Sequence, residues 1–142
     1  MPRYTLEQIG YLLLTKAAVC GPAGVRIVRL LVDTGSAYTI MPLEVLESIG
    51  CSPALSAERV RIITGSGYLI APRVQVSWFQ CLGRKDDRME VVAHTLPIGS
   101  VVDGLLGMDF LGPSGAKILL AERAIELPSR SDRAKGAFGE SA

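Results

Sequence analysis

Short β-type runs separated by glycine and proline are the feature that most limits the fold of this chain. The 142 residues include 15 glycines and 8 prolines, which recur along the whole length. Largely apolar runs of strand length lie between them, as at 11–19, 25–32 and 89–95. Such runs, bounded by turn residues, are typical of strands. The pattern predicts one all-β domain with no internal repeat and no linker.

Turn residues between these runs predict three β-hairpins. Gly21-Pro22-Ala23-Gly24 is typical of a hairpin connection, and Gly65-Ser66-Gly67 gives another hairpin a glycine-rich tip. Residues 83–88 are predicted as a charged turn. The predicted strand pairs are 11–19 with 25–32, 59–64 with 68–77, and 117–120 with 124–127.

Two short helices interrupt the strands. Residues 42–49 begin with Pro42, which suits a first helical position, and carry apolar residues at helical spacing before Gly50. Residues 105–111 are expected to include a helical turn, with Asp109 near its start. We expect Asp109 to be structural, capping that turn through backbone N–H groups.

The charge balance excludes several classes of partner. Lys and Arg number 15 against 14 Asp and Glu, a net charge of +1, so no basic excess points to nucleic acid or an acidic membrane. Apolar residues make up 49% of the chain, yet none of the apolar runs approaches the ~20 residues of a membrane span. A mean hydropathy of +0.33 is high for a small soluble monomer. The surplus predicts a large interface in an obligate oligomer.

Cysteine and histidine are too few for a metal site. The three cysteines lack C-x-x-C spacing, and His94 is the single histidine, expected to be a strand residue without catalytic duty. We therefore expect no metal, no other cofactor and no disulfide framework, and a reducing cytoplasm as the location. From residue 129 onward the chain is small, polar and charged, so 129–142 is predicted as a disordered tail after a 1–128 domain.

The motif that carries chemistry follows the apolar run 30–32. Asp33-Thr34-Gly35-Ser36 places a carboxylate in a tight loop with two hydroxyls and a glycine. This loop resembles the active-site loop of pepsin-type and retroviral aspartic proteases. Residues 32–42 (V-D-T-G-S-A-Y-T-I-M-P) resemble the signature of the small retropepsin-like proteases of bacteria.

Three later segments extend the resemblance, which covers about residues 11–128. Residues 62–70 resemble the family's flap hairpin, 105–111 resemble the apolar-apolar-Gly element that wraps the catalytic loop, and 117–127 match strands used for pairing between subunits. The implied fold is an all-β, retropepsin-like closed barrel with a flap hairpin, in an obligate homodimer. The implied roles are catalysis by Asp33, Thr34 and Gly35; active-site support by Ser36, Leu105, Leu106 and Gly107; and substrate binding by Ile63, Thr64, Gly65, Ser66, Gly67 and Tyr68.

The chemistry of this family needs two carboxylates that share one proton across a water molecule. The chain has a single Asp-Thr-Gly, because neither Asp103 nor Asp109 is followed by Thr-Gly or Ser-Gly. The second carboxylate must then come from a second copy, with Thr34 hydrogen-bonded across the dyad. The predicted activity is that of an aspartic endopeptidase acting on peptides or proteins. A Ser36 hydroxyl donated to the carboxylate would favour acidic conditions.

Two other interpretations remain open. One is a non-catalytic dimeric peptide-binding module on the same fold, which the intact Asp33-Thr34-Gly35 disfavours. The other is a monomeric β-barrel adaptor in which the motif occurs by chance. The family's ion pair between the loop and the late helix is absent, since Ala37, Tyr38 and Met108 stand in its positions. The late helix must therefore be anchored in another way.

Overall fold

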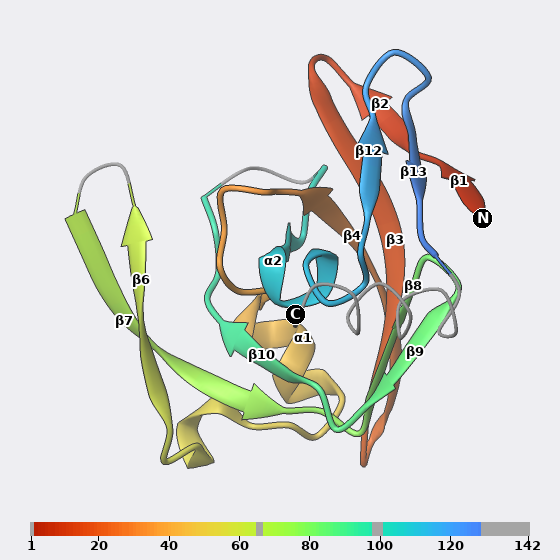
Figure 1. The fold of residues 1–142 in the computed structure, drawn as a ribbon. Helices are drawn as coiled ribbons and strands as arrows, with labels where there is room; N and C mark the ends of the chain where they lie inside the picture. The colour runs from red at the N-terminus through yellow and green to blue at the C-terminus, as the bar shows by residue number, and fades with distance from the viewer. Residues whose placement is uncertain (1, 65–66, 98–100, 129–142) are drawn as a thin grey trace, which may run out of the picture.

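A computed structural model describes residues 2–64, 67–97 and 101–128, which form a curled β-sheet with two short helices (Figure 1). The helices are α1 (Leu43–Ser48) and α2 (Met108–Leu111), and a 3-10 turn, η1, spans Pro53–Leu55. The strands are β1 (Arg3–Thr5), β2 (Glu7–Ile9), β3 (Leu12–Gly21), β4 (Gly24–Val32), β5 (Ile40–Met41), β6 (Arg59–Thr64), β7 (Gly67–Gln75), β8 (Trp78–Cys81), β9 (Arg84–Asp87), β10 (Glu90–Ala93), β11 (Gly104–Leu106), β12 (Lys117–Leu119) and β13 (Ala124–Glu126).

The main sheet follows the order β6-β7-β10-β5-β11-β4-β3-β8-β9, and β2 pairs with β3. Its centre is the long antiparallel hairpin of β3 and β4, where Leu14 pairs with Leu31 and Gly21 with Gly24. In β3, Ala17 and Val19 are buried two residues apart, so this face of the strand points into the core. The hydrogen-bonded path runs from β6 to β9, which gives a curled, incompletely closed barrel.

Strand β11 is inserted between β4 and β5. It runs parallel to β4, with Leu106 opposite Val32, and antiparallel to β5. Gly104 permits this close fit, because a Cβ there would lie 1.9 Å from the carbonyl oxygen of Ile40. The insertion places the end of β11 beside the end of β4, where the Asp33 loop begins.

The core lies on the concave side of the sheet and against both helices. Phe79 of β8 packs edge-to-face on Phe110 of α2, with ring centroids 5.6 Å apart. A second, smaller cluster of Ile40, Ala71 and Val92 lies beneath the β6–β7 hairpin. The hairpin is therefore packed on the sheet at its base.

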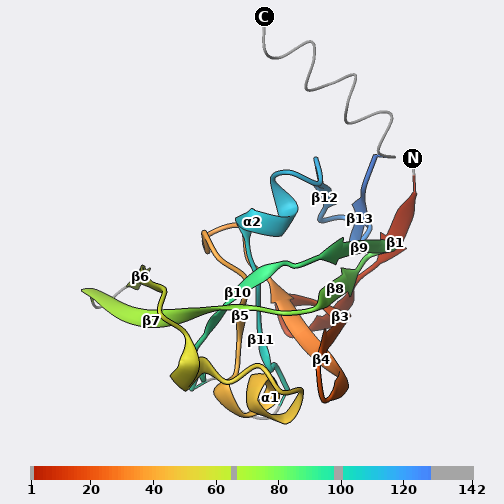
Figure 2. The same cartoon turned by 90° about the horizontal axis from the view of Figure 1, so that it is seen from below.

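The two ends of the described chain meet in a separate three-stranded sheet of order β1-β13-β12. Arg3 pairs with Glu126, and the Leu127 N–H donates to the carbonyl of Pro2 at 3.1 Å. Figure 2 shows this terminal sheet and the β6–β7 hairpin at opposite sides of the molecule. Strand β13 thus pairs with the chain's own β1 and with β12, and the outer edges of β1 and β12 stay unpaired among the described residues.

The all-β fold, the three hairpins and both helices are confirmed. The prediction of a charged turn at 83–88 is wrong, because Arg84–Asp87 is strand β9, paired with β8. The turn lies instead at Leu82 and Gly83, whose φ angles are 50° and 71°. Strands β1 and β2 were not predicted. The predicted tail, 129–142, lies outside the described residues.

Candidate active site

Asp33 stands at the end of β4, at the start of a tight loop. Its Oδ1 accepts a hydrogen bond from the Gly35 N–H at 2.8 Å, and the Ser36 N–H donates to the Asp33 carbonyl at 3.2 Å. The Asp33 N–H donates to the carbonyl of Leu106 at 3.0 Å. The loop therefore continues the pairing of β4 with β11, which fixes the carboxylate at the rim of the sheet.

Ser36 and Thr34 differ in their contacts. The Ser36 hydroxyl donates to the carbonyl of Tyr38 at 2.7 Å. Because a hydroxyl carries one hydrogen, Ser36 does not donate to the Asp33 carboxylate here, and the predicted effect of Ser36 on the pH optimum loses its basis. Thr34 is exposed, and within the described part of the chain its hydroxyl makes no hydrogen bond.

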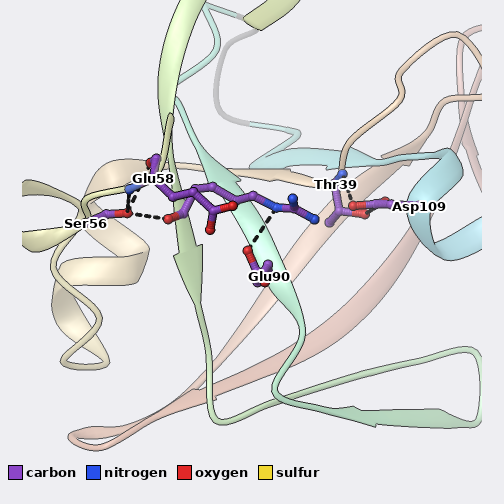
Figure 3. Close-up of polar contacts among 6 residues, drawn as sticks. Thr39, Ser56, Glu58, Glu90 and Asp109 are labelled. Atoms are coloured by element: carbon purple, nitrogen blue, oxygen red, sulfur yellow. Dashed lines mark hydrogen bonds and ion pairs between the residues drawn. The ribbon is translucent and has the colours of Figure 1, made fainter. Parts of the chain in front are cut away.

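A buried threonine and a partly buried aspartate join the loop to α2. The Thr39 N–H and hydroxyl donate to the two carboxylate oxygens of Asp109, at 2.9 and 2.7 Å (Figure 3). The Thr39 hydroxyl also accepts the Gly107 N–H at 3.1 Å. Asp109 thus anchors α2 to the loop, and the predicted cap is wrong because its side chain makes no cap hydrogen bond to the helix.

Gly107 lets the end of β11 pass close to the loop. A Cβ on Gly107 would lie 2.3 Å from the carbonyl oxygen of Tyr38 and 3.0 Å from that of Ser36. The next residue, Met108, donates its N–H to the Ser36 carbonyl at 2.8 Å. Leu105, Leu106 and Gly107 therefore lie against the Asp33 loop, and their role in active-site support stays a prediction.

A cavity of about 540 Å³ opens between this loop and the β6–β7 hairpin. Asp33 is the one carboxylate among the lining residues of this cavity. Arg61 adds a guanidinium group and His94 an imidazole. The rest of the lining is mostly apolar, a composition usual for ligand sites. The lining consists of Asp33, Gly35, Ser36, Ala37, Tyr38, Ile40, Arg61, Ile62, Ile63, Leu69, His94, Leu96 and Leu105.

The hairpin presents different residues to its two faces. Ile62 and Leu69 are opposite one another in the ladder and pack on the smaller core cluster, whereas Ile63 and Tyr68 are 83% and 60% exposed. Ile63 lines the cavity but Tyr68 does not, and the Arg61 guanidinium lies 4.4 Å from the Tyr68 ring centroid. Gly65 and Ser66, two predicted flap residues, lie outside the described residues.

Polar contacts hold the base of the hairpin. Arg73 of β7 forms an ion pair with Glu90 of β10 at 3.1 Å, and its guanidinium lies 5.8 Å from the Tyr38 ring. The Ser56 hydroxyl donates to the carbonyl of Arg73 and accepts the Glu58 N–H at 3.3 Å (Figure 3). Tyr38 therefore connects the hairpin to the Asp33 loop.

Thr39, Arg61 and His94 line or support this site but were not predicted as parts of it. The sequence offers one indication for Thr39, which stands close to the motif and between apolar residues. A threonine that is buried in such a position needs a polar partner. Arg61 and His94 gave no such indication, because only the packing of β6 and β10 brings them to the cavity.

The loop and the cavity agree with the family comparison. A model of the aspartyl protease family matches residues 16–110, two thirds of the chain, including the Asp33 loop and the β6–β7 hairpin. The chain belongs to the aspartyl protease family. Within the family its fold is retropepsin-like.

Comparison with solved structures supports this fold. A retropepsin-like aspartic protease from Rickettsia conorii superposes with a TM-score of 0.62 at 16% sequence identity. The match covers 88% of this chain and 98% of that chain. A search of curated proteins found no significant match.

Other parts of the described chain offer less chemistry. A wider groove of about 630 Å³ between η1 and β7 has no carboxylate in its lining. Residues 2–64, 67–97 and 101–128 contain no group of three or more metal-ligating side chains, and their helices are too short to cross a membrane. The Asp33 cavity is therefore the candidate active site.

Proposed function

We propose that this protein is an aspartic endopeptidase that hydrolyses peptide bonds with a water molecule activated by Asp33 and the same residue of a second copy. The observation that carries the proposal is the hydrogen-bonded Asp33 loop at the cavity beneath the hairpin. Membership of the aspartyl protease family supports peptidase chemistry in general. The pairing of two Asp33 residues is our inference.

Two carboxylates about 3 Å apart share one proton, because both cannot be ionised cheaply. The ionised carboxylate takes a proton from the water, whose oxygen attacks the peptide carbonyl carbon. The protonated carboxyl gives its proton to the carbonyl oxygen, and a tetrahedral intermediate forms. Collapse of this intermediate transfers a proton to the departing nitrogen and breaks the C–N bond.

A second copy is needed because one chain brings a single carboxylate to the cavity. In a two-fold dimer, identical loops meet at the axis. Thr34, exposed and without a hydrogen bond in the described chain, is available to bond the partner loop. Gly35, also exposed, leaves the backbone accessible to a substrate.

The β6–β7 hairpin would close over the bound peptide and exclude water. Ile62, Ile63 and Leu69 supply apolar contacts for substrate side chains. The proposed location remains a reducing cytoplasm, because Cys20, Cys51 and Cys81 are all free thiols.

Substitution of Asp33 tests the proposal. Asp33→Asn should abolish cleavage of a peptide library, a loss of at least about 10³-fold, because the amide cannot take the proton from water. Asp87→Asn is a matched control, since Asp87 is exposed on β9 and absent from the cavity. Wild-type activity in Asp33→Asn would refute the proposal.

The second candidate is a dimeric peptide-binding module that does not hydrolyse its ligand. The apolar lining of the cavity is the observation that allows it. This candidate predicts that wild-type protein binds peptides without cleaving them over the accessible pH range. It also predicts that Asp33→Asn binds as the wild type does.

A further inference from the structure

The β6–β7 hairpin carries apolar side chains on both of its faces. Its inner face packs on the smaller core cluster through Ile62 and Leu69. On its outer face, Ile63, Tyr68 and Ile70 are 83%, 60% and 59% exposed. Antiparallel strands with one face in water usually place polar residues on that face, so an apolar outer face is unusual. Exposed apolar patches commonly mark contact surfaces.

The ladder between β6 and β7 defines the members of this outer face. The pairs Ile62–Leu69 and Ile63–Tyr68 are adjacent in the ladder, so their side chains lie on opposite faces. Every second pair shares the face of Ile63 and Tyr68. We call these residues the outer hairpin face: Arg59, Arg61, Ile63, Tyr68, Ile70 and Pro72. In both Figure 1 and Figure 2 the hairpin extends away from the rest of the described chain.

Two arginines give the outer hairpin face a positive charge. Arg59 and Arg61 are exposed, and neither forms an ion pair with a carboxylate of the described residues. The Arg61 guanidinium instead lies 4.4 Å from the Tyr68 ring centroid. By contrast, Arg73 at the base of the same hairpin pairs with Glu90. The outer hairpin face therefore suits a ligand that combines apolar side chains with a carboxylate.

The outer hairpin face meets the Asp33 cavity at the edge of β6. Arg61 and Ile63 belong to the face and also line the cavity. Strand β6 stands at one end of the order of the main sheet, so no described strand pairs with its other edge. A peptide that leaves the cavity past this edge would therefore reach the outer hairpin face.

We propose that the outer hairpin face is a second binding surface for the polypeptide substrate, selective for a flanking segment that combines apolar side chains with Asp or Glu. This inference rests on the proposed function, which places a peptide in the cavity. Arg59 and Ile63 are four residues apart on β6, which is about 13 Å at about 3.3 Å per residue. About five extended residues of the substrate, beyond those in the cavity, would cover the face.

Peptides with and without such a segment test this inference. An apolar octapeptide that the wild type cleaves is extended at either end with Leu-Asp-Ile-Asp-Leu, and matched extensions carry Asn or Lys in place of Asp. One of the two acidic extensions should raise kcat/KM at least 10-fold over the octapeptide. The Asn extension should raise it less, and the Lys extension least. Equal values for the Asp and Lys extensions would overturn the inference.

The double variant Arg59→Gln/Ile70→Thr assigns the effect to the outer hairpin face, because neither residue lines the cavity. It should cleave the octapeptide as the wild type does and lose most of the gain from the acidic extension. Arg26→Gln/Ile27→Thr is the matched control, since both residues are exposed on β4, and it should keep the gain. Circular dichroism checks that both variants are folded. A double variant of the hairpin that keeps the full gain would refute the surface.

Binding to the Asp33→Asn protein separates this inference from the proposed function. Fluorescence anisotropy measures the dissociation constant of a labelled octapeptide that carries the acidic extension. Adding Arg59→Gln/Ile70→Thr should weaken this binding at least 10-fold. Such weakening, with a wild type that cleaves no peptide, supports the surface and refutes the proposed function. Cleavage of the octapeptide with no gain from either acidic extension refutes the surface and leaves the proposed function intact.

Flotation with lipid vesicles tests the other ligand that an apolar and cationic surface can take. The vesicles contain phosphatidylcholine alone or with phosphatidylserine, and the wild type should float with neither. Flotation with the phosphatidylserine vesicles that is lost in Arg59→Gln/Ile70→Thr would overturn the inference and assign the outer hairpin face to lipid.

Discussion

At the scale of single residues, Thr39 is the position where the smallest chemical change should matter most. Its side chain is fully buried, donates to Asp109 and accepts from the Gly107 N–H. Thr39→Val keeps the volume but leaves both partners without the hydroxyl. We expect the free energy of unfolding to fall by about 2–4 kcal/mol, measured by urea denaturation.

Thr95→Val is the matched control for that substitution. Thr95 is exposed, and its hydroxyl accepts the Leu43 N–H at 3.3 Å, a contact that water can replace. It should change the free energy of unfolding by less than about 0.5 kcal/mol. Equal losses in the two variants would show that the Thr39–Asp109 contact does not stabilise the loop.

Cys81 provides a prediction about pH. Burial raises the pKa of its thiol from 9.0 to about 12. Because the folded pKa exceeds the unfolded one, the protonated thiol stabilises the fold fully below about pH 9. That contribution is lost as pH rises from about 9 toward about 12, at roughly 1.4 kcal/mol per pH unit.

The measurement compares wild type with Cys81→Ala, which cannot titrate at this position. Other groups that titrate at alkaline pH affect both proteins equally. The difference between the free energies of unfolding of the two proteins therefore isolates the contribution of Cys81. This difference should shrink as the pH rises above about 9, the ordinary value, toward the raised value of about 12. A constant difference across this pH range would contradict the prediction.

Residue positions near Asp33 could be predicted only where a local motif carries them. The Asp33-Thr34-Gly35 loop and the Leu105-Leu106-Gly107 element lie together as predicted. The partner of Asp109 was not predictable, since Thr39 is 70 residues away. The Ser36 hydroxyl turns to a backbone carbonyl two residues on, which the residue type alone does not determine.

At the scale of elements, the junction of β11 and α2 depends on a glycine for space. Gly107 has an extended φ of −98°, so its backbone conformation would permit alanine. The available space does not permit alanine, however, because its Cβ would lie 2.3 Å from the carbonyl oxygen of Tyr38. We expect Gly107→Ala to lower the free energy of unfolding by about 2–3 kcal/mol, because the loop must move to relieve the overlap.

The same variant should also lose activity. The displaced carbonyls belong to Tyr38 and Ser36, the latter being the acceptor of the Met108 N–H. A lower kcat, measured at a temperature where the variant is fully folded, would show that the junction positions the Asp33 loop. Wild-type kcat and stability together would mean that the loop tolerates the extra methyl group.

Elements with clear turn residues were predictable, and those defined by distant pairing were not. Pro22 and Ala23 between two glycines marked the β3–β4 turn. Strand β9 consists of Arg84, Lys85, Asp86 and Asp87. This charged sequence is typical of a loop, and only its pairing with β8 makes it a strand. Strands β1 and β2 have three residues each, too few for a period-2 pattern to emerge.

At the scale of the whole molecule, the proposed dimer makes inactive subunits interfere with active ones. Wild type and Asp33→Asn mixed in equal amounts and allowed to exchange should form half of their dimers as hybrids. Each hybrid has one carboxylate and should be inactive. Total activity should then fall to about a quarter of that of an all-wild-type sample at the same protein concentration.

Asp87→Asn again serves as the control, and its mixture with wild type should keep full activity. Independent active subunits would instead give half the activity with Asp33→Asn. That result would contradict a shared active site. Sedimentation of the mixture confirms that exchange between dimers has reached equilibrium.

The contact between Pro2 and Leu127 has a consequence for engineering of the chain. Both residues line one small cavity, and their backbones are hydrogen-bonded at 3.1 Å. A bridge of a few residues could therefore close the backbone into a ring while keeping β1 beside β13. New ends opened at the Pro22-Ala23 turn would then give a circular permutant with the Asp33 cavity undisturbed.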